Sequence, residues 1–349
     1  MTPSRRTFNK LVLGAGLTAP VHFITPVRAQ PKKGDELVVG IWGGAQERIV
    51  REHVEKPLVE KYGCKVSYVL GNTLERRARA YAERGRPSFD VIYLNIYESR
   101  EALQAKVTQA PSKAVPQYEH LYEPAKIGGY GVAFNPCTIV YDGRKAKKPV
   151  TSWKDIWNDE WKGRVSWPEG LGTEGIAALM MTARTFGGTE KDFDMVIQKV
   201  KQLKPFAAIH SSQVQLYDMF DQGICDIGVE FSSFTRKYAE TKNPNIVIAD
   251  PVEGQAISMN VGCITEGTRN QVLAEEWINL HLSEPCMLAF AREIYYSPTV
   301  RNITIPDDLK GKVLAGDDIA KMVDFDWAYI NANRAAWQAL PAELRQLLQ

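Results

Sequence analysis

Residues 36–44 read ELVVGIWGG, a short apolar run that ends in two consecutive glycines. Because β-branched residues are frequent in the run, it predicts a buried strand, and the glycine pair predicts a tight turn directly after it. Residues 46–62 then have the pattern of a helix. A strand, a turn and a helix in this order open an α/β unit.

The same alternation continues along most of the chain. Further strands are predicted at residues 65–70, 89–94, 164–167, 206–209, 227–231 and 257–264. Further helices are predicted at residues 74–84, 175–186, 190–202, 213–222 and 270–282. Strands that alternate with helices indicate an α/β fold in which each sheet is mixed, mostly parallel, and flanked by helices.

The length of the chain predicts two lobes. A single hydrophobic core stops growing at about 250–300 residues, and this chain has 349. We place lobe 1 at residues 36–135 and 257–300 and lobe 2 at residues 136–256. Residues 301–349 are predicted to form a C-terminal helical segment that packs on the lobes.

The first 29 residues have the layout of a bacterial export signal. SRRTFNK at residues 4–10 precedes a short apolar run at residues 11–19, and VRA at residues 27–29 is a small-residue cleavage site. The paired arginines are typical of the twin-arginine route. The run is far below the ~20 apolar residues that span a bilayer. We therefore predict a twin-arginine signal peptide at residues 1–29 and a periplasmic mature protein with no membrane span.

The charge balance excludes one class of partner. Residues 1–29 contain four basic residues and no acidic one, so the 43 Lys and Arg of the chain fall to 39 after cleavage, against 41 Asp and Glu. A slightly acidic mature chain argues against a nucleic-acid partner.

The cysteines argue against a metal site. The chain has Cys64, Cys137, Cys225, Cys263 and Cys286, without a CxxC pair or a histidine at metal-ligand spacing. We expect no metal and no cofactor. Because twin-arginine substrates fold before export, in a reducing compartment, buried free thiols are favoured over a disulfide.

Several short motifs follow one another in a fixed order. They are VVGIWGG at 38–44, KYGCKV at 61–66, FDV at 89–91, TSWKDIWNDEWKGRV at 151–165, DQGICDIG at 221–228, EEWIN at 275–279 and YSPTVRN at 296–302. With these motifs the chain resembles, over most of residues 36–305, the extracellular solute-binding proteins of ABC importers, specifically their spermidine/putrescine-binding branch. The segment at 151–165 and the YSPTVRN motif are the most specific parts of this resemblance.

The resemblance implies a fold, a function and partners. The fold is the two-lobed, type II periplasmic binding protein fold, with the ligand in a cleft that closes by hinge bending. The function is capture of a small-molecule solute and its delivery to a membrane permease, and not catalysis. The permease of the ABC importer is the expected protein partner, and the chain itself is expected to be a monomer.

The candidate ligand-binding residues follow from the position of the strands. In open α/β sheets, ligands bind beyond the carboxyl ends of the strands. The residues predicted by this rule are Trp42, Gly43, Gly44, Tyr93, Asn95 and Tyr97 in lobe 1, Trp167, Thr173, Glu174, Glu230, Phe231 and Ser232 in lobe 2, and Asn260 on the returning strand. Spaced two apart, Tyr93, Asn95 and Tyr97 are expected on one strand face or in the turn after it. Packing in the core is the alternative for each aromatic residue.

The charge of the solute stays open at this stage. Thr173 and Glu174 precede an apolar helix, whose free backbone N–H groups would favour an anion, while Glu174 and Glu230 would attract a cation. The polyamine-binding branch surrounds an ammonium group with aromatic walls and carboxylates. Asn260 stands where that branch carries an aspartate. We therefore expect a small polar or cationic organic solute, with polyamines among the candidates.

Three other functions were weighed. The adjacent Tyr295 and Tyr296 suggest a ferric-iron-binding protein, since phenolate suits a hard cation. An exported hydrolase would need a nucleophile beside a base, and His210-Ser211-Ser212 is the nearest candidate, here interpreted as a solvent-facing loop. A ligand-sensing receptor would use the same closing cleft as a transport protein.

Overall fold

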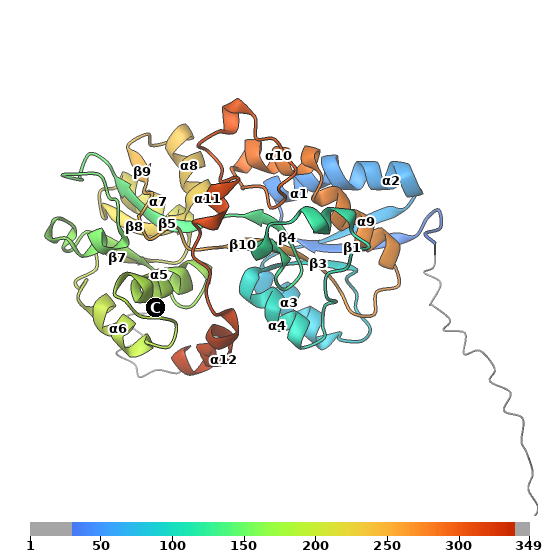
Figure 1. The fold of residues 1–349 in the computed structure, drawn as a ribbon, viewed down its shortest axis with the longest axis horizontal. Helices are drawn as coiled ribbons and strands as arrows, with labels where there is room; N and C mark the ends of the chain where they lie inside the picture. The colour runs from blue at the N-terminus through green and yellow to red at the C-terminus, as the bar shows by residue number, and fades with distance from the viewer. Residues whose placement is uncertain (1–29, 339–349) are drawn as a thin grey trace, which may run out of the picture.

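Two separate five-stranded sheets, one in each lobe, form the framework of residues 30–338, the part of the chain that this computed structural model describes. The lobes lie side by side, and the C-terminal segment runs between them (Figure 1). The predicted two-lobed α/β fold is confirmed. The predicted signal peptide lies outside the described residues, as does the end of the predicted C-terminal segment, residues 339–349.

In each sheet, a strand that adjoins the hinge lies between two other strands. The lobe 1 sheet has the order β2-β1-β3-β10-β4, from β1 (Glu36–Ile41), β2 (Lys65–Leu70), β3 (Val91–Asn95), β4 (Tyr130–Phe134) and β10 (Met259–Ile264). The lobe 2 sheet has the order β7-β6-β8-β5-β9, from β5 (Cys137–Asp142), β6 (Val165–Pro168), β7 (Ala208–His210), β8 (Ile227–Phe231) and β9 (Ile246–Ile248). We propose the lobe boundaries given above on the basis of this division.

The two sheets share one pattern of strand direction. In lobe 1, β1 pairs in parallel with β2 and β3, while β10 runs antiparallel to β3 and β4. In lobe 2, β6 pairs in parallel with β7 and β8, while β5 runs antiparallel to β8 and β9. Parallel and antiparallel pairings are thus equal in number, because one strand in each sheet, β10 in lobe 1 and β5 in lobe 2, runs against the direction of the other four.

Helices cover both faces of each sheet. Lobe 1 contains α1 (Ala45–Val50), a π-helical turn (Arg51–Glu55), α2 (Lys56–Tyr62), α3 (Thr73–Ala82), α4 (Ile96–Gln104), α9 (Gln271–His281) and α10 (Glu284–Ile294). Lobe 2 contains α5 (Thr173–Thr185), α6 (Phe193–Lys201), α7 (Gln213–Asp221) and α8 (Ser232–Thr241). The C-terminal segment contains α11 (Asp317–Ala320) and α12 (Trp327–Gln338). Short 3₁₀ helices lie at Pro116–His120, Glu123–Lys126, Trp153–Trp157, Asp159–Trp161 and Asp307–Leu309.

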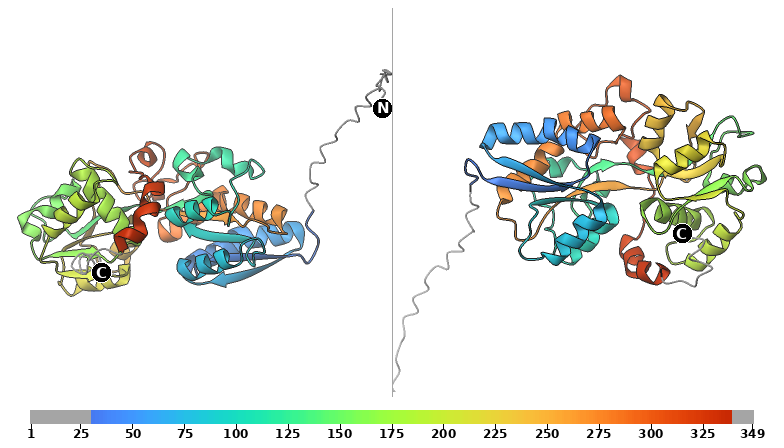
Figure 2. Two further views of the ribbon diagram at one scale, coloured as in Figure 1. Left: turned by 90° about the horizontal axis from the view of Figure 1, so that it is seen from below. Right: turned by 180° about the vertical axis from the view of Figure 1, so that it is seen from behind.

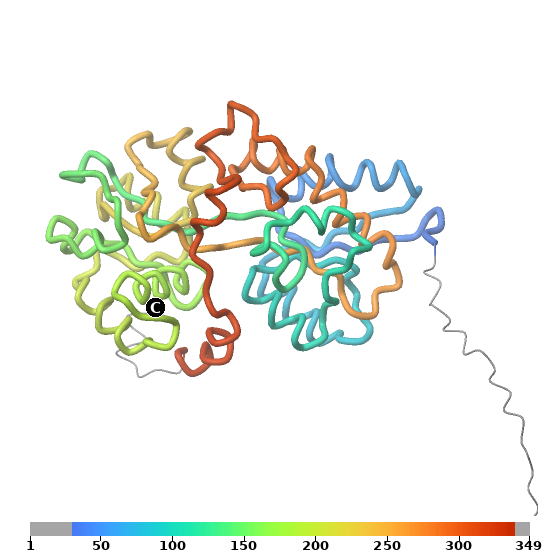
Figure 3. Tube along the Cα trace, viewed as in Figure 1, coloured from blue at the N-terminus to red at the C-terminus, as the bar shows by residue number. Residues whose placement is uncertain are grey.

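The chain passes between the lobes at three places, which can be followed on its trace (Figure 3). They are the link from β4 to β5, the residues that precede β10, and the C-terminal segment. Cys137 and Ala256 exchange backbone hydrogen bonds of 2.9 Å, and Phe134 and Ser297 do the same. Val323 lies beside Ala256 in a further parallel bridge. The hinge is therefore a narrow band of paired extended backbone, and its buried residues join the cores of the two lobes.

The segment that contains Tyr93, Asn95 and Tyr97 differs from its prediction. β3 ends at Asn95 and α4 begins at Ile96, with Asn95 as the helix cap, whose side chain accepts a hydrogen bond from the backbone of α4 while Glu98 bonds back to the backbone of Asn95. Tyr97 is therefore in a helix, and Tyr93, Asn95 and Tyr97 do not share a strand face. The strand was predicted at residues 89–94 and ends at Asn95, where the capping box starts α4 directly.

Candidate functional site

The carboxyl ends of central strands from both sheets meet at the hinge. Asn95, the last residue of β3, is paired with Asn260 of β10. Phe231, the last residue of β8, is paired with Cys137 at the start of β5. The edges from which ligands are bound in open α/β sheets thus lie on either side of the junction.

Lobe 1 brings a network of amide groups and one phenol to this junction. The side-chain nitrogen of Asn260 donates to Gln46 Oε1 at 3.1 Å, and Gln46 Nε2 donates to the hydroxyl of Tyr296 at 3.3 Å. The register of β10 against β4 shifts between Asn260 and Val261, and such a bulge turns a side chain away from the regular sheet direction. The bulge therefore lies at Asn260, the residue that bonds to Gln46.

Lobe 2 brings two carboxylates to the same place. Glu230, on β8, is 1% exposed; its Oε1 accepts a hydrogen bond of 2.7 Å from the backbone N–H of Phe231, and within the described residues its Oε2 has no partner. Burial raises the pKa of Glu230 well above its ordinary value, and the charge of Glu174 raises it further. Burial also raises the pKa of Glu174, in the first turn of α5. The junction therefore holds an acidic pair that is incompletely compensated.

Tyr296 connects the two lobes electrostatically. Burial raises the pKa of its hydroxyl; hydrogen bonds with Asn135 and Asn260 act in the opposite direction, and the charge of Glu174 adds to the rise. Asn135 in turn accepts a hydrogen bond from Ser233 of lobe 2. We call the connected residues Gln46, Asn95, Glu174, Glu230, Phe231, Asn260 and Tyr296 the interlobe site.

Aromatic rings also bridge the lobes. The ring of Phe231 meets Phe234 edge to face at 5.6 Å, and Phe234 lies 5.9 Å from Tyr296. The half-buried Phe231 therefore forms the lobe 2 end of an aromatic series that reaches lobe 1. Aromatic faces next to carboxylates are suited to a cationic group.

Trp42 lies at the end of β1 and is half-buried. Its indole N–H donates to Thr73 Oγ1 at 3.1 Å, and the guanidinium of Arg76 lies 4.7 Å from its ring. Part of the indole surface is thus already in contact with a cation of lobe 1. Gly43 and Gly44 follow, both exposed, and Gly44 has a φ of 71°, which favours glycine there.

Three predicted residues lie apart from the interlobe site. Tyr93 is in the lobe 1 core, where its hydroxyl lies 2.7 Å from His281 Nδ1 and 2.8 Å from the indole nitrogen of Trp277. Trp167 is buried against Phe206 in lobe 2. Ser232 lines a separate hollow of about 590 Å³ between lobe 2 and residues 311–322. We do not include these residues in the site.

Thr173 and Tyr97 lie next to the interlobe site. Thr173 is buried at the first position of α5. The N-cap residue before it is Gly172, which has no side chain to cap the helix. Tyr97 is buried, its ring stacks on Trp327 at 6.4 Å, and it lies under the guanidinium of Arg334. The latter two residues belong to α12, so a third part of the chain borders the site.

Sequence reasoning missed five residues around the junction: Gln46, Asn135, Phe234, Tyr296 and Arg334. Gln46 was assigned to a helix, and Tyr296 to a tail motif. One signal was available for Tyr296, because it opens the YSPTVRN motif, whose Ser297 pairs with Phe134 at the end of β4, next to the hinge. Arg334 had no local signal, since its position depends on where α12 packs.

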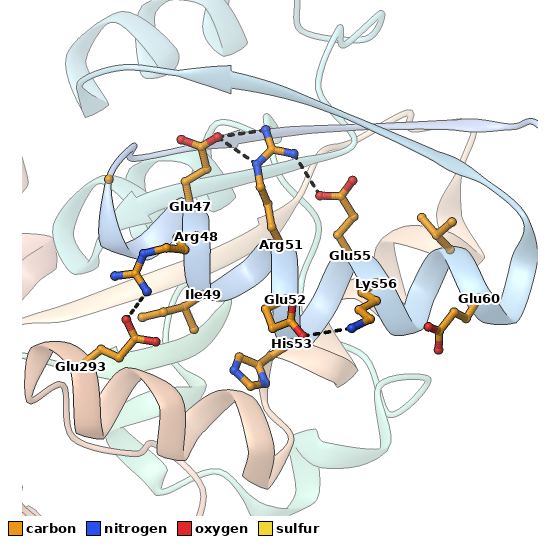
Figure 4. A pocket seen from close by; sticks show the side chains of 12 residues that line it. Glu47, Arg48, Ile49, Arg51, Glu52, His53, Glu55, Lys56, Glu60 and Glu293 are labelled. Carbon is orange, nitrogen blue, oxygen red and sulfur yellow. Dashed lines mark hydrogen bonds and ion pairs between the residues drawn. The ribbon is translucent and has the colours of Figure 1, made fainter.

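Another hollow lies on lobe 1, away from the interlobe site (Figure 4). It has a volume of about 850 Å³, and all of its lining residues belong to α1, the π-helical turn, α2, their flanks and Glu293 of α10. Its arginines are already paired, Arg48 with Glu293 and Arg51 with Glu47 and Glu55. Because lobe 2 contributes nothing to it, closure of the lobes could not enclose a ligand there.

The geometry speaks against two of the alternative functions. The hydroxyl of Tyr295 bonds to Glu240, whereas that of Tyr296 bonds to Gln46, so the adjacent tyrosines do not converge on one ion. His210 was expected in a solvent-facing loop, but it is buried and lies 2.9 Å from Ser166 Oγ, and burial lowers its pKa to about 4. Ser211 bonds to Gln215 instead, so His210 does not activate it.

Comparison with known proteins identifies the class. Solved structures with the same two-lobed fold include an ABC transporter protein from Clostridium perfringens (TM-score 0.79, 21% identity, 90% of this chain and 100% of that one). A putative extracellular solute-binding protein from Bordetella parapertussis matches with a TM-score of 0.77 and 23% identity over 90% and 97% of the two chains. The spermidine/putrescine substrate-binding protein PotD from Streptococcus pneumoniae matches with a TM-score of 0.72 and 16% identity over 90% and 100%. No match is found among curated protein sequences.

Residues 89–333 match the model of a family described as bacterial extracellular solute-binding protein. The chain belongs to this family. As a member of this family it is an extracellular solute-binding protein rather than an enzyme. Among residues 30–338, no helix combines the length and apolar character needed to cross a membrane.

Proposed function

We propose that the chain captures a small organic solute bearing a cationic amine at the interlobe site and delivers it to a permease after the lobes close. The observation that carries this proposal is the buried carboxylate of Glu230, with one oxygen unpartnered and Glu174 close enough to raise its pKa. The similar fold of a protein named for spermidine and putrescine is consistent with an amine.

The electrostatic argument starts from the cost of burial. A buried carboxylate without a full set of partners is unfavourable, and a second carboxylate nearby adds repulsion. An ammonium group between them would pair with both charges and supply the missing hydrogen-bond donor. Phe231 would contribute an aromatic face to the same group. Asn260 and Gln46 would orient the rest of the solute, because amides accept and donate without adding charge.

A thermal-shift titration with amines tests the proposal. A ligand at ~100 times its dissociation constant stabilises the native state by roughly 2.7 kcal/mol. We expect amines to raise the melting temperature of the wild type, and the matched neutral alcohols to leave it unchanged. Stabilisation by anionic solutes alone would show that the acidic pair is not the ligand site.

We further propose that residues 1–29 direct export by the twin-arginine route. The support is the RR pair at positions 5–6, ahead of an apolar run. Substitution of both arginines by lysine should leave the full-length chain in the cytoplasm, as fractionation would show. Continued appearance of the processed chain outside the cytoplasm would indicate another route.

We propose that the protein acts as a monomer and feeds a permease rather than a sensor. Solute uptake by cells that lack the chain, measured against cells in which it is restored, separates these roles. Uptake that does not depend on the chain, with a solute-dependent signalling response that does, would favour the sensor.

A further inference from the structure

The C-terminal helix α12 contacts both lobes. On the lobe 1 side, Trp327 stacks on Tyr97, and Asn331 Nδ2 donates to the backbone oxygen of Tyr97 at 3.0 Å. On the lobe 2 side, Trp337 stacks on Phe193 at 4.2 Å with the ring planes within 2° of parallel. Figure 2 shows the C-terminal segment between the lobes from two further directions. A helix fixed in this way places its side chains at the junction.

Arg334 occupies the middle of this helix and touches both lobes. Its Nη2 donates to the backbone oxygen of Leu171 at 2.6 Å, and its guanidinium lies 4.3 Å from the centre of the Tyr97 ring. Leu171 is in the loop that leads to α5 and Glu174, and Tyr97 is two residues beyond Asn95. Arg334 is thus next to the ends of β3 and β6, the positions from which a bound solute is contacted.

The charge of Arg334 is not neutralised by a direct partner. Across residues 30–338, no carboxylate lies within 4.0 Å of its guanidinium, and its buried Nε has no hydrogen-bond partner. Glu98 is the acidic residue that feels its charge: burial raises the pKa of Glu98, and Arg334 with Arg77 and Arg76 opposes the rise. Since Glu98 bonds to the backbone of Asn95, its carboxylate already serves the capping box.

A planar guanidinium that has no carboxylate partner of its own matches the carboxylate of a ligand, which accepts two parallel hydrogen bonds. We propose that Arg334 is a specificity-determining residue that binds a carboxylate group of the solute, so that the solute is an amino acid-like zwitterion. This inference rests on the proposed function, because it places the ammonium group of the same solute at Glu174 and Glu230. Pairing each end with an opposite charge offsets the cost of desolvating a zwitterion when the lobes close.

Solutes of matched length distinguish binding of the ammonium end from binding of the carboxylate end. At each chain length from three to six carbons, binding of the ω-amino acid, the α,ω-diamine and the α,ω-dicarboxylate is measured by calorimetry with the full mature protein. We expect the ω-amino acid to bind at least roughly 10-fold more tightly than the diamine at the best length, which corresponds to about 1.4 kcal/mol.

Three variants assign that preference to Arg334. Arg334→Gln should weaken binding of the ω-amino acid by roughly 30-fold or more and change diamine binding by less than about 3-fold, since it removes one partner of a desolvated charge pair. Arg334→Lys keeps the charge without the planar fork and should give an intermediate loss. Arg86→Gln is the matched control, because Arg86 is an exposed arginine of lobe 1 away from the junction, and it should behave as the wild type.

The outcomes distinguish the two proposals. If diamines bind as tightly as ω-amino acids, or if Arg334→Gln weakens both equally, Arg334 does not select a carboxylate, while the amine site stands. If no amine binds to the wild type at any length, the proposed function fails and the inference fails with it. Melting temperatures of the ligand-free variants show whether a loss reflects unfolding; if Arg334→Gln does not fold, the Arg334→Lys comparison decides.

Discussion

The two lobes bring chemically different edges to the hinge. In lobe 1, two arginines lie near the junction: Arg76 lies over Trp42 and donates to the backbone oxygen of Tyr93, and Arg77 is paired with Glu101, although the buried Nε of each has no partner. In lobe 2, Glu230 has an unpartnered oxygen, and its neighbour is another acid, Glu174. The two arginines of lobe 1 thus contact a carboxylate, a backbone oxygen and an aromatic face, whereas lobe 2 holds two neighbouring carboxyl groups without a basic partner among the described residues.

This difference assigns separate tasks to the lobes. Uncompensated charge decides which solute charge is bound, so the selection for an amine falls to lobe 2. The amides of Gln46, Asn95 and Asn260 are neutral and directional, so they suit the orientation of a solute. Removal of the acidic groups of lobe 2 should therefore weaken amine binding most, and changes confined to lobe 1 should affect it less.

The largest effect is expected for the double variant Glu174→Gln and Glu230→Gln. It removes both charges and retains the shape of the side chains, so amine affinity should fall by roughly 100-fold or more, equivalent to about 2.7 kcal/mol. Calorimetry with the best-binding amine measures the loss. The Glu101→Gln variant removes a lobe 1 carboxylate that is paired with Arg77 and serves as the control; an equal loss there would contradict the division between the lobes.

A smaller effect is expected for Phe231→Ala. Loss of the aromatic face should weaken amine binding by roughly 10-fold, because cation–π contacts contribute about 0.5–2 kcal/mol. The ligand-free melting temperature should change little, since Phe231 is half-buried at the end of β8.

Trp42→Ala is the matching change in lobe 1, and here we expect the larger effect on the stability of the ligand-free protein. It removes the surface on which Arg76 lies and the partner of Thr73, so we expect it to lower the ligand-free melting temperature more than Phe231→Ala does. Differential scanning calorimetry of the two variants checks the order. A reversed order would place Trp42 among the solute contacts and Phe231 in the core.

The dependence of stability on pH should be smaller still and has a defined sign. Because the folded-state pKa of Glu230 is raised above its ordinary value of 4.5, the proton that it holds stabilises the fold fully below about pH 4.5. That stabilisation is lost as the pH rises through the raised pKa. Denaturant unfolding of the ligand-free protein between pH 4.5 and 8 should show a decline that Glu230→Gln reduces; an unchanged slope would contradict the burial of an ionisable Glu230.

The smallest effect is expected in the outer hollow of lobe 1. Arg51→Ala removes ion pairs with Glu47 and Glu55, and exposed pairs of this kind contribute about 0.3–0.5 kcal/mol each. Solute binding should be unchanged. A loss of binding in this variant would move the site from the hinge to the hollow.

The fold could be predicted because local patterns determine its parts. ELVVGIW is apolar and β-branched, and the strands and helices that follow it alternate at the spacing of an α/β protein. The strand-end rule also directed attention to Asn95, Glu174, Glu230 and Asn260, which the structure brings to the hinge. These residues carry a signal because their position depends on the end of one strand.

The remaining site residues depend on tertiary packing. Tyr93 was chosen by the same rule, yet its side chain points to the core, because the rule gives the position along a strand and not the face. Gln46 lies at the start of a helix, Tyr296 directly after the C-terminal cap of α10 and Arg334 on a helix far along the chain. Only the packing of these elements brings them together.

The cysteines have a practical consequence. Cys64, Cys137, Cys225, Cys263 and Cys286 are all buried and unpaired, and burial raises the pKa of each thiol, to about 12 for Cys225. Since thiolates and not thiols react with alkylating reagents, the native molecule should be almost inert to them. The rate at which these five thiols are alkylated, measured by mass spectrometry, would thus report the rate of global unfolding without an added label.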